Sequence, residues 1–335
     1  MAGWFSLGFR TNERNGASGF DKVARRVSGK WLAAFAVLSV GAAAFATVAL
    51  AHGRLGQNAN VPLVTQDGQE VHFYDDVIKG KTVAVNFIYT HCMFACPLET
   101  ARMAQVQKKL GDRVGKDIFF YSISIDPDHD TPAVLKEYMQ DFDIGPGWTF
   151  LTGKRADIDL LAYRLGLTDT PNITDVASGP GQEVDGHTPH LLMGNDLTNQ
   201  WMRDSAGDNP SVIARFLSDL VGYNSPAANP VTARGGGDGG SIKLNAGQYL
   251  FAKQCAACHT IGQGDKIGPD LKDVTHRRDR EWLERFICEP EKMREDGDSI
   301  AVALAQRYKV VMPNLSISDH DAALLIDYLS AVASQ

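Results

Sequence analysis

The sequence predicts a mixed α/β domain over residues 53–223, a small all-α domain over residues 242–335, and one transmembrane helix before them. Three observations support this organisation. Apolar, β-branched runs alternate with helix-like segments in the first domain, which is typical of a mixed sheet with helices on both faces. Helix-like patterns dominate the second domain. Residues 31–51 form an uncharged apolar run that is long enough to span a bilayer.

Composition and charge narrow the class of protein. A chain of 335 residues with 44% hydrophobic and 22% charged residues is ordinary for two or three globular domains. A net charge of −7 argues against a general nucleic-acid binder. The five cysteines form a CxxxC pair, a CxxC pair and one remaining thiol, Cys288. They are too few for a disulfide scaffold, so their spacings indicate sites.

The N-terminal segment predicts export. Residues 1–30 are polar and basic, so this tail is expected to stay in the cytoplasm under the positive-inside rule. The rest of the chain would then lie in the periplasm, held by a single-pass anchor in the inner membrane. A cleaved signal peptide is the alternative, because residues 49–51 (ALA) resemble a cleavage site. The length of the apolar run favours the retained anchor.

The α/β domain is expected to begin with an edge hairpin, whose turn is Asp67-Gly68, and to end with a strand pair around Asn195-Asp196. Between them, Thr131 is a candidate N-cap before Pro132. The expected elements are a hairpin (61–81), strands (82–88, 117–125, 148–152), helices (98–110, 131–142, 156–165), a strand pair (190–194, 200–203) and a closing helix (210–221). A strand, a cysteine loop and a helix, followed by a βα unit and a ββα unit, indicate a thioredoxin-like fold.

Cys92 and Cys96 lie at the connection between the strand of residues 82–88 and the helix that follows it. Pro97 suits the first turn of that helix. A thiol at a helix N-terminus has a lowered pKa. Positions i and i+4 of a helical turn are about 6 Å apart at Cα, which fits a disulfide or two thiolates on one soft metal ion. A structural disulfide or two inert buried thiols is the alternative interpretation.

Three segments in this order resemble the SCO/SenC family of thioredoxin-fold copper proteins: NFIYTHCMFACP, SISIDPDHDTP and WTFLTG. The resemblance covers nearly all of residues 60–222. It implies that Cys92 and Cys96 bind copper with a histidine that precedes a late strand. In the segment VDGHTPHLLMGND, His187 takes that place, although His190 is the alternative ligand. The family resemblance further implies delivery of copper to the binuclear copper centre of cytochrome c oxidase subunit II.

The chemistry of this ligand set agrees with the resemblance. Two thiolates and one imidazole suit Cu(I), with zinc as a competitor. Oxidation of the thiols to a disulfide would release the metal, so redox state and metal load are coupled. His91 and Met93 are interpreted as neighbours of the site rather than ligands. Asp126 and Asp130 are interpreted as turn and cap residues that follow a strand.

A Gly- and Pro-rich linker, residues 224–241, leads to a second motif. Cys255 and Cys258, with His259, form CxxCH, the attachment signature of c-type haem, in which both thiols form thioethers and the histidine ligates the iron. Zinc binding or disulfide exchange is the alternative for such a motif.

The segments IGPDL and VMPNL and a final helix over residues 318–333 follow, and the whole stretch resembles a class I cytochrome c domain. The resemblance implies that Met312 is the distal iron ligand. A His/Met pair favours electron transfer over oxygen chemistry. Met293 is interpreted as a packing residue, and Cys288 as a buried apolar side chain.

The sequence is compatible with three functions. The first is a copper chaperone for oxidase assembly that carries a tethered haem and works with redox partners of that haem. The second is a thiol–disulfide oxidoreductase, which would make the protein an enzyme with Cys92 and Cys96 as its redox pair. The third is an electron carrier to an oxidase, with the α/β domain as a docking module. A haem carries one electron and a disulfide takes two, so the Cu(I)/Cu(II) couple matches the haem better. A peroxidase is disfavoured because both cysteines lie in one loop.

Overall fold

A computed structural model of the protein describes residues 57–167, 191–222 and 245–333. The expected membrane span, residues 31–51, and the expected linker, residues 224–241, lie outside these ranges. Within the described ranges, no helix combines the length and the apolar character needed to cross a membrane.

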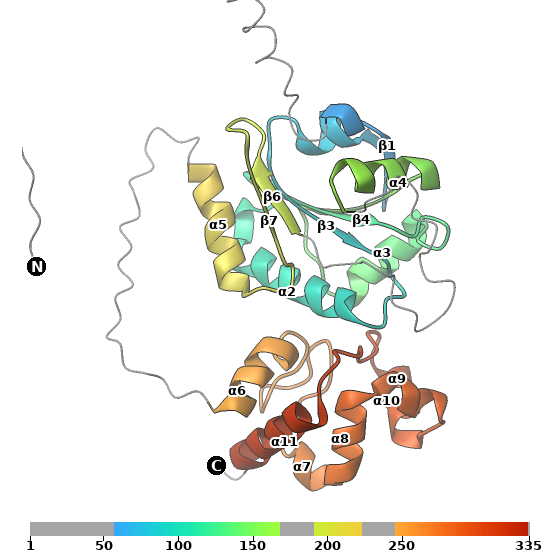
Figure 1. Cartoon of the computed structure of the whole chain (residues 1–335), viewed down its shortest axis with the longest axis vertical. Helices are drawn as coiled ribbons and strands as arrows, with labels where there is room; N and C mark the ends of the chain where they lie inside the picture. The colour runs from blue at the N-terminus through green and yellow to red at the C-terminus, as the bar shows by residue number, and fades with distance from the viewer. Residues whose placement is uncertain (1–56, 168–190, 223–244, 334–335) are drawn as a thin grey trace, which may run out of the picture. The chain divides into compact units, whose positions relative to one another are not determined.

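One seven-stranded mixed sheet forms the centre of the α/β domain (Figure 1). Its strand order is β2-β1-β5-β4-β3-β6-β7. The strands β3, β4 and β5 are parallel to one another, whereas β1 with β2, β1 with β5, β3 with β6 and β6 with β7 are antiparallel. The strands are β1 (Pro62–Thr65), β2 (Glu70–His72), β3 (Thr82–Ile88), β4 (Ile118–Ser124), β5 (Trp148–Thr152), β6 (Leu191–Asn195) and β7 (Gln200–Asp204).

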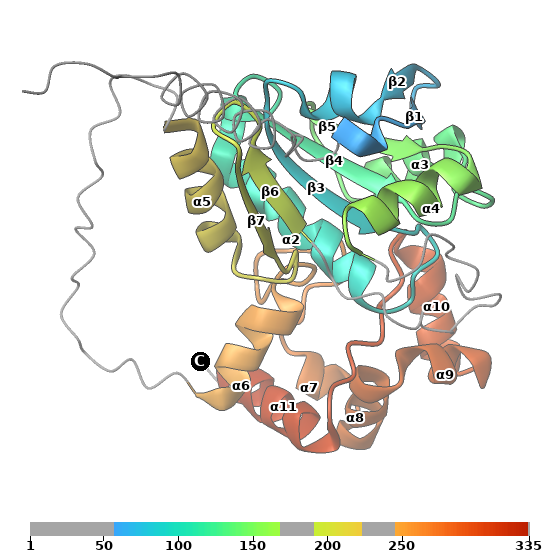
Figure 2. The same cartoon turned by 45° about the horizontal axis from the view of Figure 1, so that its top comes forward.

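Helices cover both faces of this sheet (Figures 1 and 2). They are α2 (Ala95–Leu110), α3 (Pro132–Asp141), α4 (Arg155–Arg164) and α5 (Pro210–Gly222), with the short helices η1 (Gln57–Ala59), η2 (Phe73–Ile78) and η3 (Gly111–Arg113). The order β3-α2-β4 followed later by β6-β7-α5 is a βαβ unit and a ββα unit. The predicted thioredoxin-like arrangement is therefore confirmed.

Strand β3 is buried along its whole length because it supplies side chains to two cores. Ala84 and Ile88 belong to a cluster that contains residues of α2, α3 and α5. Val83, Val85 and Phe87 belong to a second cluster on the opposite face, with residues of α4 and η2. Successive side chains of a strand point to opposite faces, so a strand in this position requires a continuous apolar run.

Three boundaries differ from the sequence-based expectation. The hairpin ends at His72, and η2 follows it, because Phe73, Tyr74, Val77 and Ile78 share one buried helical face. Helix α2 begins three residues earlier than expected, at Ala95, so that its first turn contains Cys96. The turn between β6 and β7 lies after Asn195, at residues 196–199.

The C-terminal domain is all-α, as predicted (Figure 1). Its elements are α6 (Ala246–Leu250), η4 (Phe251–Cys255), α7 (Val274–Arg277), α8 (Arg280–Cys288), α9 (Pro290–Glu295), α10 (Ser299–Arg307) and α11 (Asp319–Ala333). The sequence pattern anticipated the first helix, α8 and α11. It did not anticipate α10, nor α7 and α9, whose four and six residues carry too little periodicity to detect.

The first and last helices of this domain cross at Gly247. A Cβ atom added there would lie 2.1 Å from the carbonyl oxygen of Leu324 in α11. Next to the crossing, the rings of Phe251 and Tyr328 pack with their centroids 5.8 Å apart. Backbone contact of this kind needs a residue without a side chain, which explains a glycine inside a helix, where it is otherwise unfavourable.

We expect Gly247→Ala to destabilise the C-terminal domain. Alanine would gain about 1 kcal/mol in helix propensity, but the clash with α11 would cost about 2 kcal/mol or more. Thermal unfolding of the full chain, followed by circular dichroism, measures the difference. Gln248→Ala on the exposed side of the same helix is the control, with an expected change within about 0.5 kcal/mol. A stabilised Gly247→Ala variant would contradict the close crossing.

Candidate functional site

The cysteine loop connects two buried elements. Strand β3 ends at Ile88, α2 begins at Ala95, and Cys92 lies between them with its N–H donated to the carbonyl of Tyr89 at 3.3 Å. Only Cys96 is part of the helix, so the expectation that both thiols lie on one helical turn is corrected. Both thiols are free, with exposed fractions of 6% for Cys92 and 0% for Cys96.

The pKa values of the two thiols are shifted in opposite directions. A hydrogen bond from the Cys96 thiol, helped by Tyr89 and by backbone N–H groups, lowers the pKa of Cys92 to about 6, although burial opposes the shift. The same hydrogen bond raises the pKa of Cys96, and burial and the negative charge of Cys92 act in the same direction. Two coupled groups of this kind share their protons. At neutral pH the pair therefore holds one proton, which makes Cys92 the thiolate.

Asp130 fixes the start of the cysteine loop. Its carboxylate accepts hydrogen bonds from the backbone N–H of Thr90 at 3.1 Å and from the hydroxyl of Thr90 at 2.5 Å. Ser124, at the end of β4, donates to the same carboxylate at 2.6 Å. Ile88 and Ser124 are paired in the parallel register, so both strands end at this edge. Asp130 is therefore more than a turn residue, because it positions the backbone that leads to Cys92.

Asp126 organises a second polar group beside the loop. Its carboxylate accepts a hydrogen bond from Arg155 Nη2 at 2.9 Å and pairs with His129 Nδ1 at 2.6 Å. His91 Nε2 lies 3.6 Å from the same carboxylate. This contact agrees with the interpretation of His91 as a neighbour of the cysteines.

Glu99 is a buried acid that the sequence analysis missed. It lies in α2 with an exposed fraction of 2%. Its Oε1 has no hydrogen-bond partner among the described residues. Burial, followed by the charge of Cys92, raises the pKa of Glu99 to about 7. The available sequence signal was a carboxylate three positions after Cys96, on a helix that packs against the core.

His187 and His190 lie outside the described residues. The first described residue after them is Leu191, which pairs with Asn86 of β3 in the antiparallel register. Since β3 ends two residues beyond Asn86, the chain enters β6 near the edge where the cysteine loop begins. In the described part of the chain, no cluster of three or more His, Cys, Asp or Glu side chains could hold a metal ion.

His259 of the second motif is half-buried and is oriented by its backbone surroundings. Its Nδ1 lies 2.9 Å from the carbonyl oxygen of Pro269. Because a carbonyl only accepts, Nδ1 carries the proton and Nε2 keeps its lone pair for a metal. Burial lowers the pKa of His259, which favours the neutral imidazole. A Cβ atom on Gly268 would lie 2.6 Å from the imidazole, so glycine is needed beside this ring.

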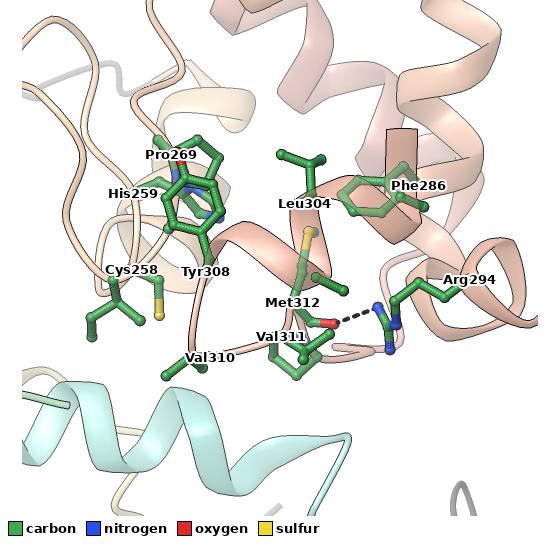
Figure 3. A pocket seen from close by; sticks show the side chains of 15 residues that line it. Cys258, His259, Pro269, Phe286, Arg294, Leu304, Tyr308, Val310, Val311 and Met312 are labelled. Carbon is green, nitrogen blue, oxygen red and sulfur yellow. Dashed lines mark hydrogen bonds between the residues drawn. The ribbon is translucent and has the colours of Figure 1, made fainter. Parts of the chain in front are cut away.

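Two cavities with volumes of about 60 and 130 Å³ share His259 and Met312 among their lining residues, and Figure 3 shows the smaller one. Most of the other lining side chains are apolar. The two cavities therefore adjoin and form one slot, which His259 and Met312 both line. Met293 lines neither cavity and is buried in α9, in agreement with its interpretation as a packing residue.

The donor set of this slot fits a covalently attached haem. Cys255 and Cys258 are free thiols, and burial raises their pKa values to about 12 and about 11. They precede the imidazole in the order that CxxCH attachment requires. Cys288 is half-buried like these two thiols, but it lies 3.7 Å from a carboxylate oxygen of Asp319 and lines neither cavity. The expectation of a buried apolar role for Cys288 is therefore wrong.

Comparison with known proteins identifies two domains in this chain. Residues 57–219 match the SCO1/SenC family model, and residues 244–333 match the cytochrome c family model. The SCO1 protein homolog of Bacillus subtilis is 37% identical over 101 residues, which are 30% of this chain and 51% of that protein. The mitochondrial SCO1 homolog of Homo sapiens is 32% identical over 99 residues, 29% of this chain and 32% of that protein.

Among solved structures, copper-bound ScoI of Bradyrhizobium japonicum is 26% identical, with a TM-score of 0.39, and the similarity covers 48% of this chain and 96% of that one. The chain spans about half of the B. subtilis relative and about a third of the human one. The order of the elements, the cysteine loop and the CxxCH slot agree with the two family models. The chain thus contains an SCO1/SenC domain of thioredoxin-like fold, followed by a cytochrome c domain.

Proposed function

We propose that this protein binds Cu(I) outside the inner membrane and delivers it to the binuclear copper centre of cytochrome c oxidase subunit II. The observation that carries the proposal is the cysteine pair at the end of β3, with one thiolate, one thiol and no disulfide. Soft thiolate ligands select Cu(I). The SCO1/SenC match supports the assignment to oxidase assembly.

His187 is the proposed third ligand, with His190 as its alternative. The proposal rests on the family pattern and on the sequence order, in which both residues shortly precede Leu191 of β6. A buried thiolate pair with one imidazole gives a low coordination number, which suits Cu(I) better than the tetrahedral preference of zinc.

The oxidation state of the two thiols would control the release of copper. Oxidation of both thiols to a disulfide removes two electrons and two protons, and it removes both sulfur ligands. Asp130 holds the loop that carries Cys92, so the geometry of the pair is fixed before the metal arrives. Such preorganisation lowers the cost of binding.

The cytochrome c domain would hold haem c through Cys255 and Cys258, with His259 and Met312 as the iron ligands. Haem, when bound, supplies one-electron exchange. The chain orients His259 through Pro269 and surrounds the slot with apolar side chains that exclude water. We propose that this domain exchanges electrons with the copper site or with external redox partners.

Anchoring in the inner membrane by residues 31–51, with both domains in the periplasm, is part of the proposal. It rests on the apolar run and the basic residues before it. Covalent haem attachment and a thiol pair with a redox function both agree with an exported protein.

A thiol–disulfide oxidoreductase is the second candidate function, because the lowered pKa of Cys92 favours it specifically. A thiolate at neutral pH is the nucleophile that attacks a disulfide of a target protein, and Cys96 would then resolve the mixed disulfide. Reduction of a disulfide substrate by the reduced, copper-free protein, lost in Cys92→Ser, would support the reductase; no such activity in the wild-type protein would count against it.

Titration of the reduced protein with Cu(I) under anaerobic conditions, against a competing chelator, tests the copper site. We expect tight uptake of one equivalent, which Cys92→Ser or Cys96→Ser abolishes. His187→Ala should weaken binding roughly tenfold or more, whereas the matched His190→Ala should change it less than about twofold. The reverse order of the two histidine variants would transfer the ligand assignment to His190.

The acidity of Cys92 can be measured by alkylation with iodoacetamide in the reduced, metal-free protein, with mass spectrometry to resolve individual cysteines. The thiolate reacts and the thiol does not, so the rate at Cys92 should be constant above pH 7 and fall through a midpoint of about 6. Cys96→Ala removes the hydrogen bond and should move the midpoint upward. A wild-type midpoint at the usual cysteine pKa of about 8.5 would contradict the shared-proton pair.

A further inference from the structure

Arg294 is the charged side chain that lines the smaller cavity of the slot, beside Met312 (Figure 3), whereas the charged residues that line the larger cavity are Asp270, Arg277 and Arg278. It belongs to α9, a short helix that the buried side chains of Pro290 and Met293 fix to the rest of the domain. Nη1 of Arg294 donates a hydrogen bond to the carbonyl oxygen of Met312 at 3.2 Å. The guanidinium thus contacts the backbone of the residue that is the proposed distal ligand.

The segment around Met312 has no helical hydrogen bonds of its own. Pro313 has no N–H to donate, so this segment depends on side chains from elsewhere. A second contact comes from the same helix, since Asn314 Nδ2 donates to Glu291 Oε1 at 2.6 Å. Glu291 and Arg294 are one turn apart on α9, and together they hold the segment on both sides of Pro313.

The second nitrogen of the guanidinium is unpaired. Arg294 Nη2 is buried and has no hydrogen-bond partner among the described residues. The negative charges near it are Glu291 and Glu295, and Glu291 has one buried carboxylate oxygen that is also unpaired. A buried guanidinium N–H without an acceptor is costly. The slot that Arg294 lines is the place from which an acceptor can come.

We propose that Arg294 couples the two parts of the haem site: Nη1 positions the Met312 segment for ligation, and Nη2 pairs with a propionate carboxylate of the bound haem. The inference rests on the proposed ligand pair of His259 and Met312. Guanidinium matches a carboxylate better than any other side chain does. Arg294 is a positioning residue for Met312 and an electrostatic partner of the haem, whose positive charge favours the reduced state.

The test uses the full chain with haem attached and two measurements, the reduction potential and the affinity of the ferric haem for imidazole, which competes with Met312. Arg294→Gln removes the charge. We expect a potential lower by at least about 59 mV, which is a tenfold change in a one-electron equilibrium. Imidazole affinity should rise roughly tenfold, because a charged hydrogen bond to the Met312 carbonyl is lost.

Lys292→Gln is the matched control, since it removes an equal charge from the exposed side of α9, where Lys292 pairs with Glu289. In Lys292→Gln, the reduction equilibrium of the haem and its affinity for imidazole should both stay within about twofold of the wild-type values. Arg294→Lys keeps the charge but not the fork, so it should retain the potential while imidazole affinity rises. If Arg294→Gln fails to fold, Arg294→Lys still tests whether Arg294 positions Met312.

Equal potentials in Arg294→Gln and Lys292→Gln would overturn the pairing with propionate, and an unchanged imidazole affinity in Arg294→Lys would overturn the positioning of Met312. Failure of the underlying ligand assignment gives a different result. Met312→Ala would then leave the ferric haem spectrum unchanged, whatever the Arg294 variants do.

Discussion

The shared proton between Cys92 and Cys96 is the interaction on which the proposed copper site depends. It exists because β3 ends in a loop whose first residues are held by a buried carboxylate, and because α2 begins early enough to contain the second thiol. One thiolate is thereby available at neutral pH without the cost of two adjacent negative charges. Metal binding then has to displace one proton only.

In the haem slot, groups from other segments likewise hold the proposed ligands in position. The Pro269 carbonyl fixes the tautomer of His259, and α9 holds the segment that carries Met312. In both proposed sites, a residue distant in the sequence positions an irregular segment that carries one of the ligands, Cys92 in the first and Met312 in the second. The positions of ligands on such segments are well defined only when side chains from rigid elements support them.

The sequence predicted the parts of the fold that are set by local pattern. Strands β3 and β5 were predicted with the observed bounds, because both are apolar runs between clear turn residues. The start of α2 was missed because proline is tolerated throughout the first helical turn. The roles of Asp130 and Arg294 were also missed, since their partners are 40 and 18 residues away and no local pattern encodes such pairs. The CxxxC and CxxCH motifs could be recognised in the sequence because metal binding and haem attachment require their residues at a fixed spacing.

X-ray absorption spectroscopy at the copper edge of the Cu(I)-loaded, reduced protein tests the central claim most directly. The account predicts a first coordination sphere of two sulfur atoms and one nitrogen atom in the wild-type protein. A sphere of nitrogen and oxygen atoms only, in wild-type protein that is fully reduced, would contradict it.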